Sequence, residues 1–168
     1  MQWRIILQID YTTTDIFWDR HASLLPLDFQ NFLGQNSGRQ KWAGVSSGAF
    51  VSSGYGSFYP QEVCGIINFS GGKKPVNANN VRDPRLLIRT VGDFGKTSRV
   101  PTLWLYAADD DIFDPPMVQE MFAEYQQAGG KGTLHILPPR HGHQLFVKGM
   151  EMWVPLVNEF LKEINPGR

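Results

Sequence analysis

Three kinds of side chain that together support acyl transfer occur in this chain in the order serine, aspartate, histidine. The serine is Ser46, at the centre of residues 44–48, Gly-Val-Ser-Ser-Gly, which fit the pattern G-x-S-x-G. The acidic run 109–111 follows later, and His141 and His143 lie nearer the C-terminus. A serine hydroxyl is a weak nucleophile until a histidine takes its proton. The histidine in turn needs a carboxylate to fix its tautomer and stabilise the imidazolium.

The pentapeptide alone is weak evidence, because Gly and Ser are common in loops and a plain turn explains it equally well. An apolar stretch, 42–45, precedes it, and a run of small residues follows it: Gly48, Ala49, Ser52, Ser53 and Gly54. This context is typical of a sharp turn between a strand and a helix. In such a turn the serine takes strained backbone and its hydroxyl stands at the N-terminus of the helix.

The elements that must position these residues alternate along the chain. Strands are expected over residues 3–9, 42–45, 63–69, 101–107 and 133–137, and helices over 86–91, 115–128 and 153–164, with Pro155 in the first turn of the last helix. Residues 11–41 lack clear periodicity, apart from a possible helix cap at Thr12–Asp15 and a turn at 34–38. The alternation predicts an α/β fold, with a mainly parallel sheet flanked by helices on both faces.

In a parallel sheet the carboxyl ends of all strands share one edge, so loops that follow different strands converge there. Ser46 follows the strand that ends near residue 45, and the acidic run 109–111 follows the strand that ends at Ala107. His141 and His143 follow the strand that ends at Leu137. The order Ser, Asp, His is that of the α/β-hydrolases.

Composition narrows the class of protein. The 168 residues suit a single domain, 1–168, and 16 basic residues balance 16 acidic ones, so no net field favours nucleic acid or an anionic membrane. No stretch of about 18 apolar residues occurs, and the N-terminus lacks the features of a signal peptide. We therefore expect a cytoplasmic protein, with export left open if the N-terminus is truncated. The single cysteine, Cys64, is interpreted as a small buried core residue.

Several motifs together resemble the dienelactone hydrolase-like α/β-hydrolases. They are Gly65–Gly72, Val100–Tyr106 with the acidic loop and Phe113 behind it, Ala128–Lys131, Leu137–Pro139, and Gly142–Phe146. The resemblance covers roughly residues 43–164. It implies a truncated α/β-hydrolase fold, in which an atypical N-terminal segment, 1–41, precedes the part from the nucleophile turn to the last helix, 42–168.

The resemblance also implies roles for individual residues. Ser46 corresponds to the nucleophile, Asp110 to the acid and His143 to the base, and the backbone N–H of Ser47 would contribute to the oxyanion hole. Founding members use cysteine as nucleophile, whereas this chain has serine, and Cys64 is not at that position. The implied activity is hydrolysis of a small-molecule ester or lactone, with no metal or organic cofactor.

The residues themselves leave other interpretations open. Residues 109–111 could form a solvated loop or, with Asp114, a loose cation site, although the pattern lacks the Gly and distal Glu of an EF-hand. His141 and His143 could bind a metal, but no third ligand is placed with them. His141 is interpreted as an exposed loop residue, and His135 as a residue on a strand surface.

The upstream part is shorter than the resemblance implies. Several strands and two helices normally precede the nucleophile turn, and at about 5–6 residues a strand and 11–12 a helix they need more than the 45 residues available. No H-G-G-like loop that could supply the second oxyanion donor occurs before Ser46. The alternative function is therefore a weak or inactive relic that acts as a binding or assembly domain. An uncovered sheet edge also predicts self-association.

Overall fold

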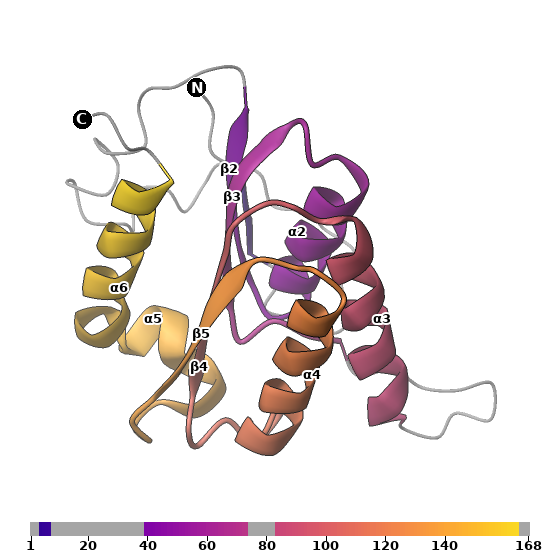
Figure 1. Cartoon of the computed structure of the whole chain (residues 1–168). Helices are drawn as coiled ribbons and strands as arrows, with labels where there is room; N and C mark the ends of the chain where they lie inside the picture. The colour runs from indigo at the N-terminus through magenta and orange to yellow at the C-terminus, as the bar shows by residue number, and fades with distance from the viewer. Residues whose placement is uncertain (1–3, 8–38, 74–82, 165–168) are drawn as a thin grey trace.

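The computed structural model describes residues 4–7, 39–73 and 83–164, and Figure 1 draws the other residues as a thin grey trace. The strands are β1 (Arg4–Leu7), β2 (Gln40–Val45), β3 (Val63–Phe69), β4 (Thr102–Ala107) and β5 (Gly132–Leu137). The helices are α2 (Ser47–Phe58), α3 (Pro84–Thr97), α4 (Pro115–Gln127), the 3-10 turn η2 (Gly142–Gln144), α5 (Leu145–Lys148) and α6 (Met150–Glu163). The expected cap at Thr12–Asp15 and the turn at 34–38 lie outside the described residues.

The five strands form one parallel sheet in the order β1-β2-β3-β4-β5. Leu7 pairs with Val45, Val45 with Phe69, and Phe69 with Leu105, so β1, β2 and β3 end in register at one edge and β4 continues two residues further, to Ala107. The loops that follow β2, β3 and β4 therefore begin side by side. This parallel α/β sheet confirms the predicted fold class.

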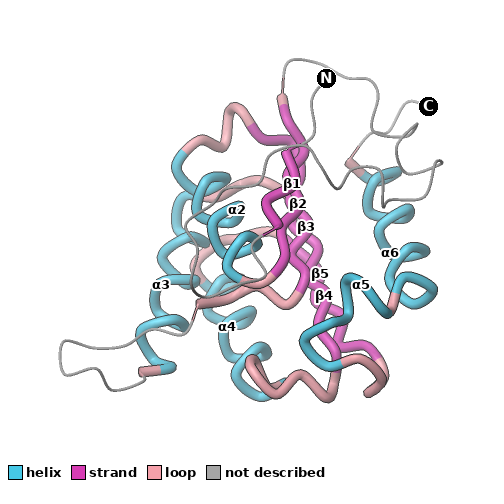
Figure 2. Tube along the Cα trace, turned by 180° about the vertical axis from the view of Figure 1, so that it is seen from behind, coloured by secondary structure: helices cyan, strands magenta, loops and turns pink. Residues whose placement is uncertain are grey.

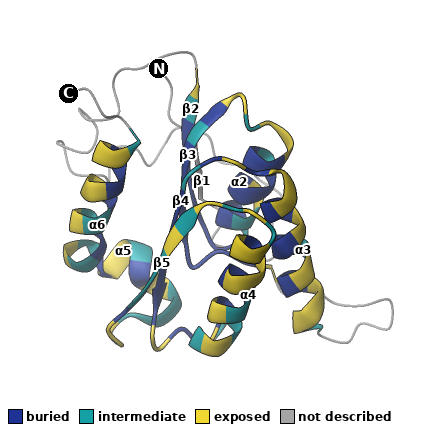
Figure 3. Cartoon of the chain, viewed as in Figure 1, coloured by how far each residue is buried: buried dark blue, intermediate teal, exposed yellow. Residues whose placement is uncertain are grey.

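Helices cover both faces of the sheet, with α2, α3 and α4 on one side and α5 and α6 on the other (Figures 1 and 2). Strand β4 shows why both layers form, because all six of its residues are buried (Figure 3). Leu103 and Leu105 belong to the core under α6, whereas Trp104 and Tyr106 belong to the core under α3 and α4. Alternate side chains of a strand point to opposite faces, so an apolar run without polar interruption supplies two cores.

Three expectations need correction. The helix expected at 86–91 runs over the whole of α3, where the Asp83 side chain accepts a hydrogen bond from the Arg85 N–H and Pro84 occupies the first turn. Pro155 lies in the second turn of α6 rather than the first, because that helix begins at Met150. Cys64 is partly exposed rather than fully buried.

Strand β1 places part of the N-terminal segment beside the nucleophile turn. It matches the strand expected over residues 3–9, of which only Arg4–Leu7 are described, and it pairs with β2 up to Val45. The chain therefore has an upstream strand directly adjacent to β2. No helix among the described residues combines the length and apolarity needed to cross a membrane.

Candidate active site

The turn after β2 holds Ser46 in backbone that few non-glycine residues adopt, with φ 54° and ψ −125°. Gly44 permits the turn, because a Cβ there would overlap the backbone of Gly48 and Ala49. The Ser46 carbonyl accepts hydrogen bonds from the N–H groups of Ala49, Phe50 and Gly72, at 3.1, 3.2 and 3.2 Å. The geometry is that of a strained strand-to-helix turn, and it places the serine at the N-terminus of α2.

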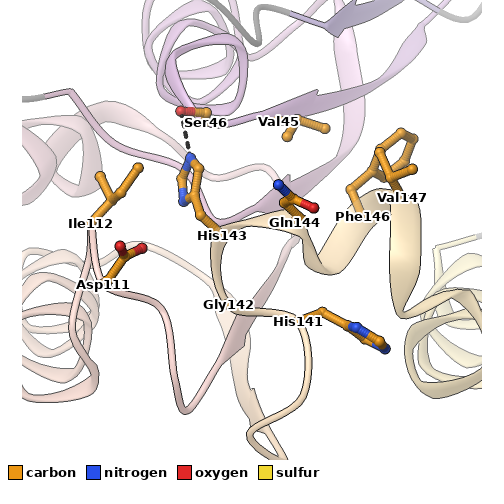
Figure 4. A pocket seen from close by; sticks show the side chains of 10 residues that line it. All are labelled: Val45, Ser46, Asp111, Ile112, His141, Gly142, His143, Gln144, Phe146 and Val147. Carbon is orange, nitrogen blue, oxygen red and sulfur yellow. Dashed lines mark hydrogen bonds between the residues drawn. The ribbon is translucent and has the colours of Figure 1, made fainter.

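His143 reaches Ser46 from the loop after β5, in the short helix η2. Its Nε2 lies 3.0 Å from the Ser46 Oγ, a contact marked by the dashed line in Figure 4. Its Nδ1 lies 3.0 Å from Oδ2 of Asp110, which follows β4. The structure thus brings the three predicted residues into one chain of hydrogen bonds across 97 positions of sequence.

Asp110 is the buried member of the acidic run, with 3% of its surface exposed. Its Oδ1 also accepts hydrogen bonds from the N–H groups of Ile112 and Phe113, at 2.9 and 3.0 Å. Burial alone would raise the pKa of this carboxyl. The hydrogen bonds from His143, Phe113 and Ile112 and the charge of His143 outweigh that penalty, so the pKa lies below its ordinary value.

The ionised state that the lowered pKa favours for Asp110 gives these hydrogen bonds a direction. An ionised Asp110 can only accept, so Nδ1 of His143 must donate to it. In a neutral imidazole the other nitrogen, Nε2, then carries the lone pair and accepts from the Ser46 hydroxyl. This is the arrangement in which a histidine can remove the proton of a serine.

The other acidic residues of the loop have separate positions. The Asp114 side chain caps α4 by accepting from the Met117 N–H at 3.0 Å, so its role is structural. Asp109 is exposed, and its Oδ1 accepts from the Gly142 N–H at 3.0 Å. Asp111 is exposed and lines the pocket described below. Among the described residues, no group of three or more His, Cys, Asp or Glu side chains could hold a metal ion.

His141 and His135 are both only partly exposed. His141, expected as an exposed loop residue, has a side chain only 21% exposed, and its Nε2 lies 3.8 Å from Oε1 of Glu151. His141 is less exposed than expected because α6 packs close to the loop after β5. This long-range contact cannot be predicted from the local sequence around His141. His135 lies on the edge strand β5 and is also partly buried.

An open pocket of about 420 Å³ lies in front of Ser46 and His143 (Figure 4). Its walls come from the ends of β2, the loop after β4 and the segment after β5: Val45, Ser46, Asp111, Ile112, His141, Gly142, His143, Gln144, Phe146 and Val147. Four of these side chains are apolar and flank the serine. The sequence did not identify the four apolar residues, Val45, Ile112, Phe146 and Val147, as pocket walls, because they come from three separate segments.

Aromatic packing fixes the apolar wall of the pocket. Phe146 stacks on Trp153 with ring centroids 5.6 Å apart, and both rings contact Phe69 at 4.9 Å. The Trp153 Nε1 donates to the Phe146 carbonyl at 3.1 Å. Trp153 is fully buried, and it holds the segment that follows His143 against the end of β3.

A second strained turn lies next to the first, after β3. Ser70 has φ 46° and is 1% exposed, and its Oγ has no hydrogen-bond partner among the described residues. Oδ1 of Asn68 accepts from the Gly71 N–H at 2.7 Å, and the Tyr106 hydroxyl donates to the Gly71 carbonyl. Together with the Gly72 N–H on the Ser46 carbonyl, this turn supports the backbone of Ser46 from behind. The Gly71-Gly72 pair was the only sequence signal for it.

Ser47, the predicted oxyanion donor, is the first residue of α2. The N–H of a first helical residue has no carbonyl within its own helix to bond. The positive end of the helix dipole adds to its capacity to bind an anion. The position is therefore suited to the predicted role.

No protein-family model and no curated protein sequence matches the chain, whereas solved structures do. A predicted CIB-like hydrolase from Thermoplasma acidophilum aligns with a TM-score of 0.58 and 20% identity, over 81% of this chain and 57% of that one. A candidate dienelactone hydrolase from Klebsiella pneumoniae aligns with a TM-score of 0.56 and 17% identity, over 79% of this chain and 56% of that one. A monoacylglycerol lipase from Paleococcus ferrophilus aligns with a TM-score of 0.58 and 14% identity, over 82% of this chain and 73% of that one.

These similarities establish the fold as that of the α/β-hydrolases, and the neighbours are hydrolases by description. The chain spans little more than half the length of the first two. At identities of 20% and below the comparison concerns the fold, so function must be argued from the site itself.

Proposed function

We propose that this protein is a serine hydrolase of the dienelactone hydrolase-like type, which cleaves an ester or lactone bond with Ser46, His143 and Asp110. The observation that carries the proposal is the continuous set of hydrogen bonds from the Ser46 Oγ through both ring nitrogens of His143 to a buried, ionised Asp110. A carboxylate with a lowered pKa fixes the histidine tautomer and stabilises the imidazolium that forms during reaction.

The reaction follows from these positions. As the Ser46 Oγ bonds to the carbonyl carbon, its proton passes to Nε2 of His143, and the Ser47 N–H binds the developing oxyanion. The carbon–oxygen bond of the ester then breaks, and Nε2 returns the proton to the leaving alkoxide. Water next attacks the acyl-serine with the same histidine as base, which releases the acid and restores Ser46. With a lactone, the alcohol and the acid are parts of one product.

The pocket supports a small substrate with an apolar part. Val45, Phe146 and Val147 lie on one side of Ser46 in the pocket, and Ile112 lies on the other side (Figure 4). Apolar walls with a few polar groups near the reacting atoms are the usual composition of small-molecule sites. No step of the proposed reaction needs a metal or an organic cofactor.

Labelling with a fluorophosphonate probe, followed by peptide mapping of the adduct, tests the proposal. The probe phosphonylates a serine whose hydroxyl is activated by a neighbouring base, so we expect an adduct on Ser46 that disappears in His143→Ala. Ser52→Ala is a matched control, because Ser52 lies on α2 and its hydroxyl donates to the Gly48 carbonyl, away from His143.

An adduct on Ser46 would be followed by turnover assays with short-chain esters and lactones. Folded protein without an adduct would contradict the proposal and favour the alternative, a domain that binds or assembles without catalysing. In that case sedimentation over a range of concentrations would test self-association through the sheet edge.

A further inference from the structure

We propose that Asp109 is a positioning residue, which ties the loop bearing Asp110 to the loop bearing His143. The inference deepens the proposed function and rests on it for its kinetic arm only. Asp109 follows β4 and Gly142 follows β5, so the hydrogen bond between them, 3.0 Å from the Gly142 N to the Asp109 Oδ1, bridges two separate segments.

The hydrogen bond between Gly142 and Asp109 lies directly beside the contact between Asp110 and His143. Asp109 directly precedes Asp110, and Gly142 directly precedes His143, so each partner is one residue from the Asp110–His143 contact. The bond runs alongside that contact and gives the two loops a second point of attachment. A single side-chain bond lets two loops pivot, whereas two adjacent bonds fix both their separation and their orientation.

The backbone conformation of Gly142 and the space around it both favour glycine at this position. Its φ of 50° lies in the left-handed region, and a Cβ at this residue would come within 3.2 Å of the Asp109 carbonyl oxygen. A side chain there would therefore be strained by its backbone and crowded by the opposite loop. The close approach of the two loops thus depends on a glycine at 142 and an acceptor at 109.

The kinetic test compares three variants under conditions where wild type turns over an ester. Asp109→Ala removes the acceptor, and we expect kcat to fall about ten- to a hundredfold with KM nearly unchanged, because a small displacement of a catalytic group is costly. Asp109→Asn keeps an acceptor oxygen and should retain kcat within about threefold, since a neutral acceptor forms a weaker but similar bond. Asp93→Ala also removes an exposed carboxylate, on α3 outside the pocket, and controls for charge.

A spectroscopic test does not depend on turnover. In proton NMR spectra, the Nδ1–H of His143 should give a downfield resonance that is protected from exchange while Asp110 accepts its hydrogen bond. The chain has four histidines, and loss of the resonance in His143→Gln would assign it to His143. We expect exchange with water to broaden this resonance in Asp109→Ala and not in Asp109→Asn. Circular dichroism melts of the same samples show whether each variant is folded.

The outcomes separate this inference from the proposed function. If Asp109→Ala matched wild type in both tests, or if Asp109→Asn were as impaired as Asp109→Ala, the positioning role would be wrong. If wild type gave neither an adduct nor turnover, the proposed function would fail. The resonance would then still decide whether Asp109 holds the two loops together.

Discussion

Two serines leave the sheet side by side, and within the part of the chain that the structure describes only one of them has a partner that could activate it. Ser46 follows β2 and Ser70 follows β3, with Val45 and Phe69 paired just before them. Both have positive φ, 54° and 46°, and both are buried. The Oγ of Ser46 lies 3.0 Å from His143, whereas the Oγ of Ser70 has no partner among the described residues.

The difference teaches that strained backbone and residue type do not by themselves make a nucleophile. Ser46 is followed by α2, whose first N–H group, that of Ser47, has no carbonyl within the helix to bond, and Ser46 lines the pocket. Ser70 is followed by Gly71, which Asn68 and Tyr106 hold in place. We interpret the first turn as presenting a hydroxyl and the second as supporting the first.

The largest expected effect separates the two serines directly. Ser46→Ala should lower kcat by a factor on the order of 10⁶, because loss of a nucleophile removes the whole covalent route. Ser70→Ala should leave kcat within about threefold, since none of the described residues places a base beside its hydroxyl and the change removes only one oxygen. Turnover of a short-chain ester measures both, and equal losses would contradict our distinction between the turns.

The next effect tests the choice among the acidic residues. Asp110→Asn should lower kcat by about 10⁴-fold, since the amide cannot enforce the required histidine tautomer. Asp109→Asn provides the matched comparison, because it makes the same change one residue away. If Asp109→Asn were as damaging, the assignment of the acid from the resemblance would be wrong.

Asp110→Asn should also change how the stability of the folded protein depends on pH. Because the pKa of Asp110 is lowered in the folded protein, its contribution to stability is complete above the ordinary carboxyl value of about 4 and is lost as the pH falls through the lower folded value. Thermal melts of wild type from about pH 6 to pH 2 should show this loss. The curve for Asp110→Asn should be flatter over the same interval.

A smaller effect tests the support of the second turn. The Tyr106 hydroxyl is fully buried and donates to the Gly71 carbonyl, and burial raises its pKa, so it remains a neutral donor. Tyr106→Phe leaves that carbonyl without its donor, at a cost of about 1–3 kcal/mol in the free energy of unfolding. Urea denaturation measures the cost. A value near zero would show that the bond does not hold the turn.

The smallest effect concerns the unpartnered hydroxyl. Ser70→Ala should change the free energy of unfolding by less than about 1 kcal/mol, and in the stabilising direction, because it removes a buried polar group that makes no hydrogen bond to any described residue. Urea denaturation detects it, with Ser53→Ala as comparison, since the hydroxyl of Ser53 donates to the Ala49 carbonyl. A clear loss of stability in Ser70→Ala would indicate a partner for this hydroxyl.

The sequence by itself determined the architecture and the order of the candidate groups. Strand β3 has the predicted bounds, 63–69, and α4 differs from its prediction by one residue, because apolar periodicity and helix-end residues are local signals. The same local signals placed Ser46, Asp110 and His143 in loops at one edge of the sheet. The alternation of strands with helices along the chain also predicted that helices would cover both faces of the sheet.

Only the tertiary structure decided how the loops meet. Which of Asp109, Asp110 and Asp111 turns inward depends on the N–H groups of Ile112 and Phe113, and their directions are set by the folded backbone. The bond from Gly142 to Asp109 joins residues 33 positions apart, so no local pattern contains it. Likewise, a hydroxyl gains or lacks a partner through long-range packing, and for that reason Ser46 and Ser70 share a backbone conformation but differ in their surroundings.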